Sequence, residues 1–434
     1  MMRELMLLTS VAMGISCASA TRGTEASPAV SPSGACCGKP VLDRGLEVAR
    51  QYRVAAITTR RFTHDQFWSA VRPLLRDSSL RVTRLGQSIL GREIRAITFG
   101  SGPVKVLLWS QMHGDEATAT MALADIFRFL AQAPNDELRQ RLARELTIVF
   151  VPMLNPDGAE LFQRENAAGI DVNRDARQLA TPEARILKGI RDSLLPEFGF
   201  NLHDQNARTL AGSTGPQAAI ALLAPAYDET KAYNPVRSRA RQVAAVIAGL
   251  LSQEIPGRVS RYDDDFTPRA FGDLMQQWGT SVILIESGTL AGDPDKQRLR
   301  ALNTAAILGA LDAIATGSYR QVDTHFYDGL AENFTGASDL IIRGGLLVFH
   351  GGVIRADVAI NFDDPTGKTG ARLRDVGDLR DLSAIDTIDA TGLFLHPGPI
   401  TPRDGEVYLR LGTSVSFAIR RGANPASELV RRIN

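Results

Sequence analysis

One pair of side chains in the sequence has the spacing of metal ligands. His113 and Glu116 are separated by two residues and follow the apolar run 104–109. An imidazole and a carboxylate at this spacing can hold one zinc ion from one side, leaving space for a third ligand and a water. The pattern is weak when taken alone, because a Glu at a helix start beside an unrelated His gives the same spacing. Its meaning depends on what else the chain brings to the same place.

Four apolar segments that read as buried strands are each followed by polar side chains. The segments and the residues that follow them are 104–109 (His113, Glu116), 146–153 (Asn155, Asp157), 198–202 (His203) and 280–285 (Glu286). In open α/β sheets, ligands bind at the carboxyl ends of the strands. If the four strands belong to one sheet, these side chains meet at one cleft.

Helical patterns separate the predicted strands. Apolar residues recur at helical spacing over 117–131, and 234–254 and 293–315 also read as helices. Thr181 followed by Pro182 has the form of a helix N-cap and first turn, and predicts a helix that reaches about residue 195. The NPDG sequence at 155–158 predicts a turn that leads the chain out of the sheet.

Composition excludes several classes of protein. The 434 residues include 49 basic and 48 acidic ones, a formal net charge of +1, so we expect no binding to nucleic acid or to a charged membrane surface. No segment after the N-terminal region approaches the roughly 18 to 20 apolar residues that span a bilayer, so we expect no transmembrane span in the mature chain.

The N-terminal region reads as a secretory signal peptide over residues 1–20. A short apolar run at 5–16 follows Arg3, and Ala18-Ser19-Ala20 has the small residues of a cleavage site. This predicts a secreted or periplasmic, envelope-associated protein. A lipid anchor at Cys17 and a disordered cytosolic N-terminus are the alternatives. Residues 21–58 read as a linker or N-terminal tail.

The motifs taken together resemble the M14 family of zinc carboxypeptidases. Six pieces match in the order of that family: GQSILGR at 86–92, HGDE at 113–116, NPDG at 155–158, DVNR at 171–174, His203 and Glu286. The resemblance covers roughly residues 60–316, and His203-Asp204-Gln205 points to a divergent bacterial-type branch. It implies an α/β fold, a three-layer α/β/α sandwich around a mixed sheet.

The resemblance also implies the metal chemistry. His113, Glu116 and His203 become the ligands of one zinc ion per chain. Glu286 becomes the general base that takes a proton from the zinc-bound water and passes it to the leaving amine. Asp171 becomes a candidate for orienting a ligand histidine.

Further residues are implied to bind the substrate. Asn173 and Arg174 would bind its free C-terminal carboxylate, because a guanidinium matches a carboxylate in two places. Arg164 is the candidate for stabilising the tetrahedral oxyanion, with a solvated loop arginine as the alternative. Tyr262 is the one tyrosine available near the substrate terminus, and Gly272 or a neighbour faces the terminal side chain.

The C-terminal part resembles something else. Segments 339–346, 354–360 and 388–398 are similar to the small β-sandwich that flanks the barrel of amidohydrolases, but the His-x-His motif of that barrel does not follow Gly398. We therefore expect a catalytic domain at 59–318 and a β-rich accessory module at 319–434 without a second active site.

The sequence favours a zinc-dependent metallocarboxypeptidase that acts on peptides with a free C-terminal carboxylate. A zinc amidase or deacylase using the same site is the second hypothesis, because it needs the same metal residues but no carboxylate-binding pair. A non-catalytic peptide-binding module is the third. The presence of Glu286 together with all three ligand residues argues against the third.

Overall fold

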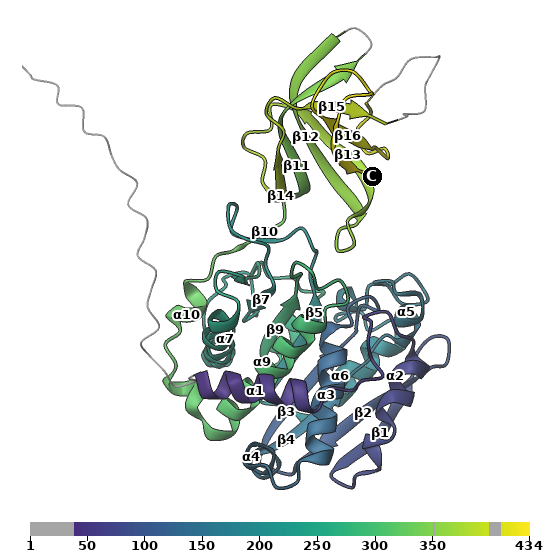
Figure 1. Ribbon diagram of the computed structural model, residues 1–434. Coiled ribbons are helices and arrows are strands. Elements are labelled where there is room, and N and C mark those ends of the chain that lie inside the picture. The colour runs from purple at the N-terminus through teal and green to yellow at the C-terminus, as the bar shows by residue number, and fades with distance from the viewer. Residues whose placement is uncertain (1–38, 350–351, 399–408) are drawn as a thin grey trace, which may run out of the picture. The chain divides into compact units, whose positions relative to one another are not determined.

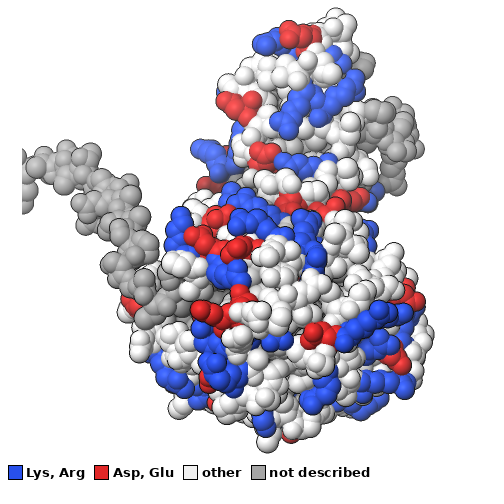
Figure 2. Space-filling view, turned by 60° about the horizontal axis from the view of Figure 1, so that its bottom comes forward, with Lys and Arg blue, Asp and Glu red and all other residues white. Residues whose placement is uncertain are grey.

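A computed structural model describes residues 39–349, 352–398 and 409–434 of the chain. The predicted signal peptide and the candidate lipid-anchor residue Cys17 lie outside the described residues. Basic and acidic side chains are interspersed over the face drawn in Figure 2, in keeping with a net charge near zero.

The region predicted to be catalytic, called the catalytic region below, is built on an eight-stranded mixed sheet with the strand order β1-β2-β4-β3-β5-β9-β7-β8. Its strands are β1 (Leu80–Gln87), β2 (Glu93–Phe99), β3 (Val104–Ser110), β4 (Leu146–Val151), β5 (Phe198–Asp204), β7 (Ile220–Leu223), β8 (Val259–Arg261) and β9 (Ser281–Ser287). The four predicted strands β4, β3, β5 and β9 are neighbours and run parallel to one another. The prediction that their carboxyl ends share one edge of one sheet is therefore confirmed.

Helices cover both faces of this sheet (Figure 1). The larger core lies under α1 (Lys39–Gln51), α2 (His64–Val71), α3 (Thr118–Gln132), α4 (Glu137–Glu145), α7 (Pro235–Glu254) and α9 (Gln297–Thr316). The smaller core lies under α6 (Pro182–Leu194) and α8 (Phe271–Gln277). This is the three-layer α/β/α arrangement that the sequence implied.

Helix α1 lies in a segment that the sequence assigned to a linker, and helix α9 has the length and apolarity of a membrane span although the sequence suggested no such segment. The segment assigned to a linker, 21–58, contains α1, which packs so closely on α9 that a Cβ at Gly45 would lie 2.6 Å from the Ala305 Cα. Helix α9 is long and apolar enough to cross a membrane, but 78% of its apolar window is buried, as expected of a core helix.

The NPDG motif does more than turn the chain. Asn155 caps a short helix, α5 (Pro156–Leu161), by accepting a hydrogen bond from the Gly158 amide. A side chain that caps a helix satisfies one of its free N–H groups, so a turn motif followed by Pro can start a helix instead.

The chain continues beyond the catalytic sheet through a segment that we call the tether, residues 329–337. Before it come η3 (Ser318–Gln321) and α10 (His325–Asp328), whose Tyr319 and Tyr327 are buried in the larger core, so core packing extends past residue 318. Within the tether, strand β10 (Asn333–Phe334) pairs antiparallel with β6 (Leu210–Ala211) of the long loop after β5.

The C-terminal module is β-rich, as predicted. Its described strands are β11 (Ser338–Phe349), β12 (Gly352–Asp364), β13 (Thr369–Gly377), β14 (Ala384–Asp389), β15 (Phe394–Pro397), β16 (Phe417–Arg420) and β17 (Leu429–Ile433). They form a seven-stranded sheet in which β11 pairs with β12, β14 and β15. The buried apolar residues of this sheet form a cluster of their own, so the module has a hydrophobic core separate from those of the catalytic region.

Candidate metal centre

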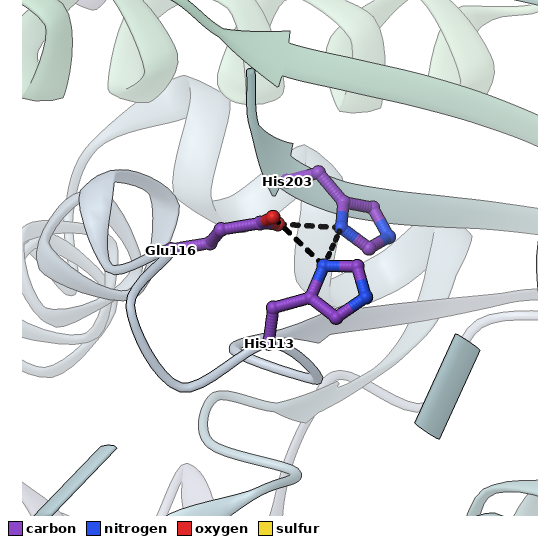
Figure 3. A group of neighbouring side chains, drawn as sticks. All are labelled: His113, Glu116 and His203. Carbon is purple, nitrogen blue, oxygen red and sulfur yellow. Dashed lines mark hydrogen bonds and ion pairs between the residues drawn. The ribbon is translucent and has the colours of Figure 1, made fainter. Parts of the chain in front are cut away.

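His113, Glu116 and His203 meet at the carboxyl edge of the sheet (Figure 3). His113 lies in the loop after β3, Glu116 lies just before α3, and His203 lies near the end of β5. The Glu116 carboxylate oxygens are 2.8 Å from His113 Nδ1 and 2.6 Å from His203 Nδ1. All three side chains are buried. The sequence separation of 90 residues between the histidines closes because β3 and β5 are neighbouring parallel strands.

The spacing of these atoms fits a shared zinc ion. The two Nδ1 atoms are 3.1 Å apart. Two nitrogens bound to zinc at about 2.0–2.1 Å with a tetrahedral angle lie about 3.3 Å apart. Two imidazoles and one carboxylate are also a common ligand set of catalytic zinc, which keeps a fourth position for water or substrate. The residues present therefore fit the metal that the sequence implied.

The protonation of the three residues reflects their mutual contact. Burial opposes ionisation of Glu116, but His113 and His203 lower the pKa of its carboxyl well below the usual range. Burial also opposes protonation of His113, yet Glu116 and Asp171 raise its pKa to about 9. Burial lowers the pKa of His203, which favours the neutral imidazole that binds metals. Because a ligand histidine must give up its proton, zinc binding here weakens as the pH falls.

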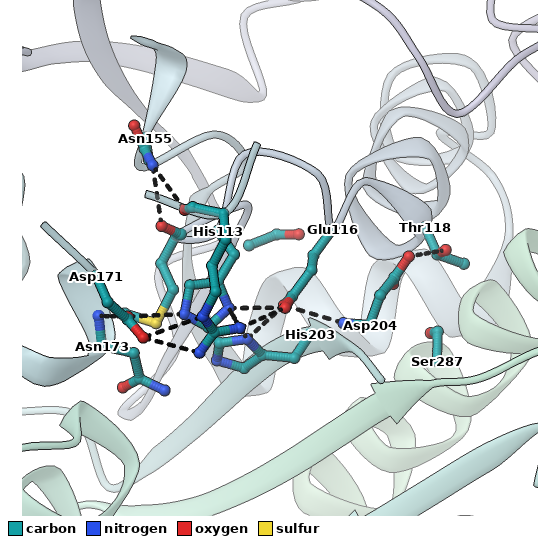
Figure 4. A network of polar contacts seen from close by, with 12 residues as sticks. His113, Glu116, Thr118, Asn155, Asp171, Asn173, His203, Asp204 and Ser287 are labelled. Carbon is teal, nitrogen blue, oxygen red and sulfur yellow. Dashed lines mark hydrogen bonds and ion pairs between the residues drawn. The ribbon is translucent and has the colours of Figure 1, made fainter. Parts of the chain in front are cut away.

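Asp171 lies beside the cluster (Figure 4), and Arg164 contacts both Asp171 and Glu116. Asp171 precedes the short helix η2 (Val172–Arg174), and its Oδ1 is 3.0 Å from His113 Nε2, the geometry that holds a ligand ring in place. Arg164 binds Asp171 Oδ2 through Nε and Nη2 and places Nη1 3.2 Å from Glu116 Oε1. The guanidinium of Arg164 is therefore directed at the metal residues.

Glu286 lies beside the cluster because of strand register. In the parallel pairing of β5 and β9, Glu286 is the direct partner of His203, so the two side chains are on the same face of the sheet. Burial, followed by the nearby Glu116 carboxylate, raises the pKa of Glu286 well above its usual range. No described residue forms a hydrogen bond with the Glu286 carboxylate. It is a buried carboxylate free to exchange a proton at the metal site.

The remaining predicted residues line the same cavity, which has a volume of about 500 Å³. Asn173 Oδ1 accepts a hydrogen bond from the Phe271 amide, and Arg174 Nη1 donates to the Asn173 carbonyl. Tyr262 follows β8, and Glu286 and then burial raise its pKa to about 12. All the predicted metal, catalytic and substrate-binding residues therefore line one cavity. They are His113, Glu116, His203, Glu286, Arg164, Asn173, Arg174 and Tyr262.

The two polar residues of the NPDG motif support this cavity without lining it. Asn155 Nδ2 donates to the backbone carbonyls of Met112 and Arg164, both at 3.3 Å, and so holds the loops that carry His113 and Arg164. Asp157 Oδ1 accepts from the Ser88 hydroxyl and from Arg92, both at 2.8 Å. The motif thus joins the segments around the site rather than entering it.

Asp273, next to the Gly272 indicated by the sequence, lines the cavity near Asn173 and Arg174. Its Oδ1 accepts a hydrogen bond from the Thr267 amide, and no described cation forms an ion pair with it. Asn201 lines the cavity too, and its Oδ1 is buried without a partner among the described residues. This part of the cavity therefore presents oxygen acceptors.

We expect Asp273→Asn to stabilise the folded protein at neutral pH. Burial raises the pKa of Asp273 from 3.8 to about 6, so at neutral pH the folded state holds a charge that the unfolded state solvates better. The cost is fully present above the folded pKa and is lost as pH falls below the unfolded pKa, where both states bind the proton. At about 1.4 kcal/mol per pKa unit it is at most about 3 kcal/mol.

Denaturant unfolding measures this prediction. Asp273→Asn should be more stable than wild type by about 1–3 kcal/mol at about pH 7.5, and the difference should close near about pH 4. The exposed Asp43 supplies the matched control, Asp43→Asn, which should change stability little at either pH. A less stable Asp273→Asn at neutral pH would show that the carboxylate has a stabilising partner.

A buried ion pair between Lys296 and Asp204 lies next to the metal residue Glu116, and no sequence motif predicts it. Lys296 Nζ lies 2.9 Å from Asp204 Oδ2, with side-chain exposures of 4% and 6%. Thr118 donates to the same carboxylate oxygen, and the Asp204 backbone N–H donates to Glu116 Oε2 at 3.1 Å (Figure 4). The ion pair thus holds the strand end whose backbone in turn holds Glu116. It could not be predicted because Lys296 lies in a polar segment 92 residues from Asp204.

Comparison with known proteins gives a family match over part of the chain. Residues 74–194 match the model of the family described as zinc carboxypeptidase. The matched segment includes the His113 and Glu116 pair but ends before His203 and Glu286. The structure is what adds these last two residues to the same site.

The chain is also similar to individual proteins. It is 25% identical over 188 residues to carboxypeptidase 2 of Trichophyton rubrum, covering 43% of this chain and 33% of that protein. It is 28% identical over 165 residues to carboxypeptidase Z of Homo sapiens, covering 31% and 25%. The match thus spans a third or less of the length of these relatives.

Solved structures are similar over a longer part of the chain. A metallo-carboxypeptidase from Burkholderia cenocepacia superposes with a TM-score of 0.46 at 17% identity, covering 59% of this chain and 70% of that one. A metallo-carboxypeptidase from Pseudomonas aeruginosa in complex with (2-guanidinoethylmercapto)succinic acid gives 0.44 at 19%, covering 60% and 70%.

Proposed function

We propose that this chain, of which residues 74–194 match the zinc carboxypeptidase family model, is a zinc-dependent metallocarboxypeptidase that removes the C-terminal residue of peptides. The observation that carries this proposal is one cavity that contains the three metal residues, Glu286 and the Asn173–Arg174 pair. The metal residues and Glu286 can carry out hydrolysis. The Asn173–Arg174 pair can bind a terminal carboxylate and so direct hydrolysis to the end of a peptide.

Each group has a task in this reaction. His113, Glu116 and His203 would hold the zinc ion, which when bound would polarise the scissile carbonyl and lower the pKa of a bound water. The Glu286 carboxylate accepts a proton from the attacking water and returns it to the leaving amine nitrogen, a task suited to a buried carboxylate with a raised pKa. Arg164 Nη1, already directed at the metal residues, supplies a donor for the developing oxyanion. Tyr262, whose pKa is about 12, keeps its proton at neutral pH and can donate to the substrate terminus.

The lack of an anionic partner for Arg174 among the described residues supports recognition of a substrate carboxylate. Its side chain donates to the Asn173 backbone carbonyl, and no carboxylate among the described residues forms an ion pair with it. A guanidinium in a cavity without an anionic partner is suited to bind one from the substrate. Asn173, held by the Phe271 amide, places its side-chain nitrogen in the same region.

The location of the protein is part of the proposal. The apolar run at 5–16 and the small residues 18–20 support export to the periplasm, the envelope or the medium. Peptides outside the cytoplasm would then be the substrates. Mass spectrometry of the mature chain, showing whether it starts after Ala20 or at a lipid-modified Cys17, tests this part.

Amidation of the substrate tests the carboxypeptidase assignment. A charge-assisted contact contributes about 1.5–3 kcal/mol, so replacing the terminal carboxylate with an amide should lower kcat/KM by roughly 10- to 150-fold or more. Arg174→Ala should lower kcat/KM for the free acid by a comparable factor and narrow its preference over the amide. The exposed Arg177 provides the control Arg177→Ala, which should keep the wild-type preference.

One outcome would replace the assignment. If the wild-type enzyme cleaves amidated and free-acid peptides at equal rates, no terminal carboxylate is being recognised. The same metal residues and Glu286 would then serve an amidase or deacylase.

A further inference from the structure

The tether enters the catalytic cavity. Asn333 and Thr335 are among its lining residues, together with Glu116 and Glu286. Asn333 belongs to β10, which is fixed to the catalytic domain by its pairing with β6. Two backbone hydrogen bonds extend this attachment, from the Gly212 amide to the Glu332 carbonyl and from the Arg261 amide to the Ala331 carbonyl, both 2.8 Å. The segment that leads to the C-terminal module is thus also a wall of the site.

The side chain of Asn333 orients Gln205. Asn333 Nδ2 donates to Gln205 Oε1 at 2.7 Å, and Asn333 Oδ1 accepts from the Ser260 hydroxyl at 2.6 Å. With the Ser260 hydroxyl donating to its oxygen, Asn333 donates to Gln205 through its amide nitrogen. In this arrangement Gln205 presents its oxygen to Asn333 and directs its own nitrogen elsewhere.

The Gln205 nitrogen is a buried donor without a partner. Gln205 Nε2 has no hydrogen-bond partner among the described residues, although Gln205 lines the cavity. A Cβ built on Gly288 would lie 3.0 Å from it, which places Nε2 beside the chain two residues after Glu286. An unsatisfied buried donor costs free energy that a bound acceptor would recover, so Gln205 Nε2 is available to an acceptor that enters the cavity.

The position of Gln205 indicates which part of a substrate it meets. In Figure 4, Asn173 and Asp204 lie on opposite sides of the metal residues, and Gln205 directly follows Asp204. A peptide with its terminal carboxylate at Asn173 and Arg174 and its scissile carbonyl at the metal residues extends its preceding residues toward Gln205. Those residues carry backbone carbonyls, which are the acceptors that an amide N–H binds.

We propose that Gln205, oriented by the tether residue Asn333, donates a hydrogen bond to a backbone carbonyl of the substrate upstream of the scissile bond. This subsite rests on the proposed function for the direction of the substrate. It makes the tether a determinant of substrate length, because a substrate with no upstream carbonyl gains nothing from it. Thr335, exposed and without a structural hydrogen bond among the described residues, lines the same wall.

Two substitutions remove the donor by different routes. Gln205→Glu keeps the bond from Asn333 but presents an oxygen to the substrate. Asn333→Asp can accept from Gln205 Nε2 and so reverses the Gln205 amide, while the Ser260 hydroxyl still has an acceptor. Both should lower kcat/KM for acetylated tri- to pentapeptides by roughly 2- to 12-fold. Both should leave kcat/KM for a phenylpropionyl-amino acid, which has no upstream carbonyl, near the wild-type value.

The control and a second readout keep the outcomes apart. Asn206→Asp adds the same charge at the next residue and should affect long and short substrates equally. Equal losses for both substrate lengths in Gln205→Glu and Asn333→Asp would overturn the subsite.

The same peptides should also bind to a Glu286→Gln protein in calorimetry, and they should bind more weakly when Gln205→Glu is added to it. Failure of the wild type to cleave any peptide, with this length-dependent binding intact, would instead remove the proposed function and leave the subsite.

Discussion

Glu286→Gln should lower kcat by about 10²- to 10⁴-fold, the usual contribution of a general base. Glutamine keeps the size and shape of the side chain but cannot accept the proton of the attacking water. The loss should appear in kcat with the zinc content unchanged, because Glu286 is not among the three residues that form the metal cluster. Amino-acid release assays and elemental analysis of the same preparation measure both quantities.

The pH profile and a matched variant sharpen this prediction. Since the pKa of Glu286 is raised by burial and by Glu116, wild-type activity should fall as the pH drops through that raised value, and this limb should vanish in Glu286→Gln. The exposed Glu137 supplies the control Glu137→Gln, which should keep full activity. A variant at Glu286 that keeps more than about a third of wild-type kcat would exclude it as the base, since a general base contributes far more than that.

His203→Ala should remove most of the zinc. Wild-type protein should purify with one zinc per chain, held by His113, Glu116 and His203. Loss of a residue that merely supports a ligand weakens metal affinity about 10- to 100-fold, so loss of a ligand itself should exceed about 100-fold. Titration against a competing chelator gives the affinities. Asp171→Asn, which disturbs the bond to His113 Nε2 but removes no ligand, should fall within the smaller range.

The control for this experiment is His325→Ala, since the His325 side chain is 89% exposed. It should bind zinc as wild type does. Stoichiometric zinc in His203→Ala after chelator treatment would remove His203 from the ligand set.

Much of the catalytic region could be predicted because its strands are continuous apolar runs. A buried parallel strand is recognisable as a continuous apolar run, and the polar residues that follow it are therefore easy to identify. This rule alone points to His203 and Glu286, which directly follow such runs, and to His113, which lies in the loop after one. The three-layer fold follows from the family that these motifs resemble, and the helices that cover both faces of the sheet (Figure 1) confirm it.

The parts that could not be predicted depend on contacts between distant segments. Gln205 and Asn333 are 128 residues apart in sequence, and no motif indicates that their side chains meet. The pairing of Lys296 with Asp204 is hidden for the same reason. Helix α1 has no clear signal because its sequence follows a tail rich in small residues, although it packs closely on α9.

The in-register pairing of His203 with Glu286 also limits how genes for this fold can change length. Side chains alternate between faces along a strand, so inserting or deleting one codon within β5 or β9 would turn the following residues to the opposite face. A ligand or the base would then leave the cleft in a single step. Exposed loops outside these strands carry no such alternation, and they tolerate added residues at little energetic cost. Length variation among descendants of this chain should therefore accumulate in loops, while the two strands accept only substitutions.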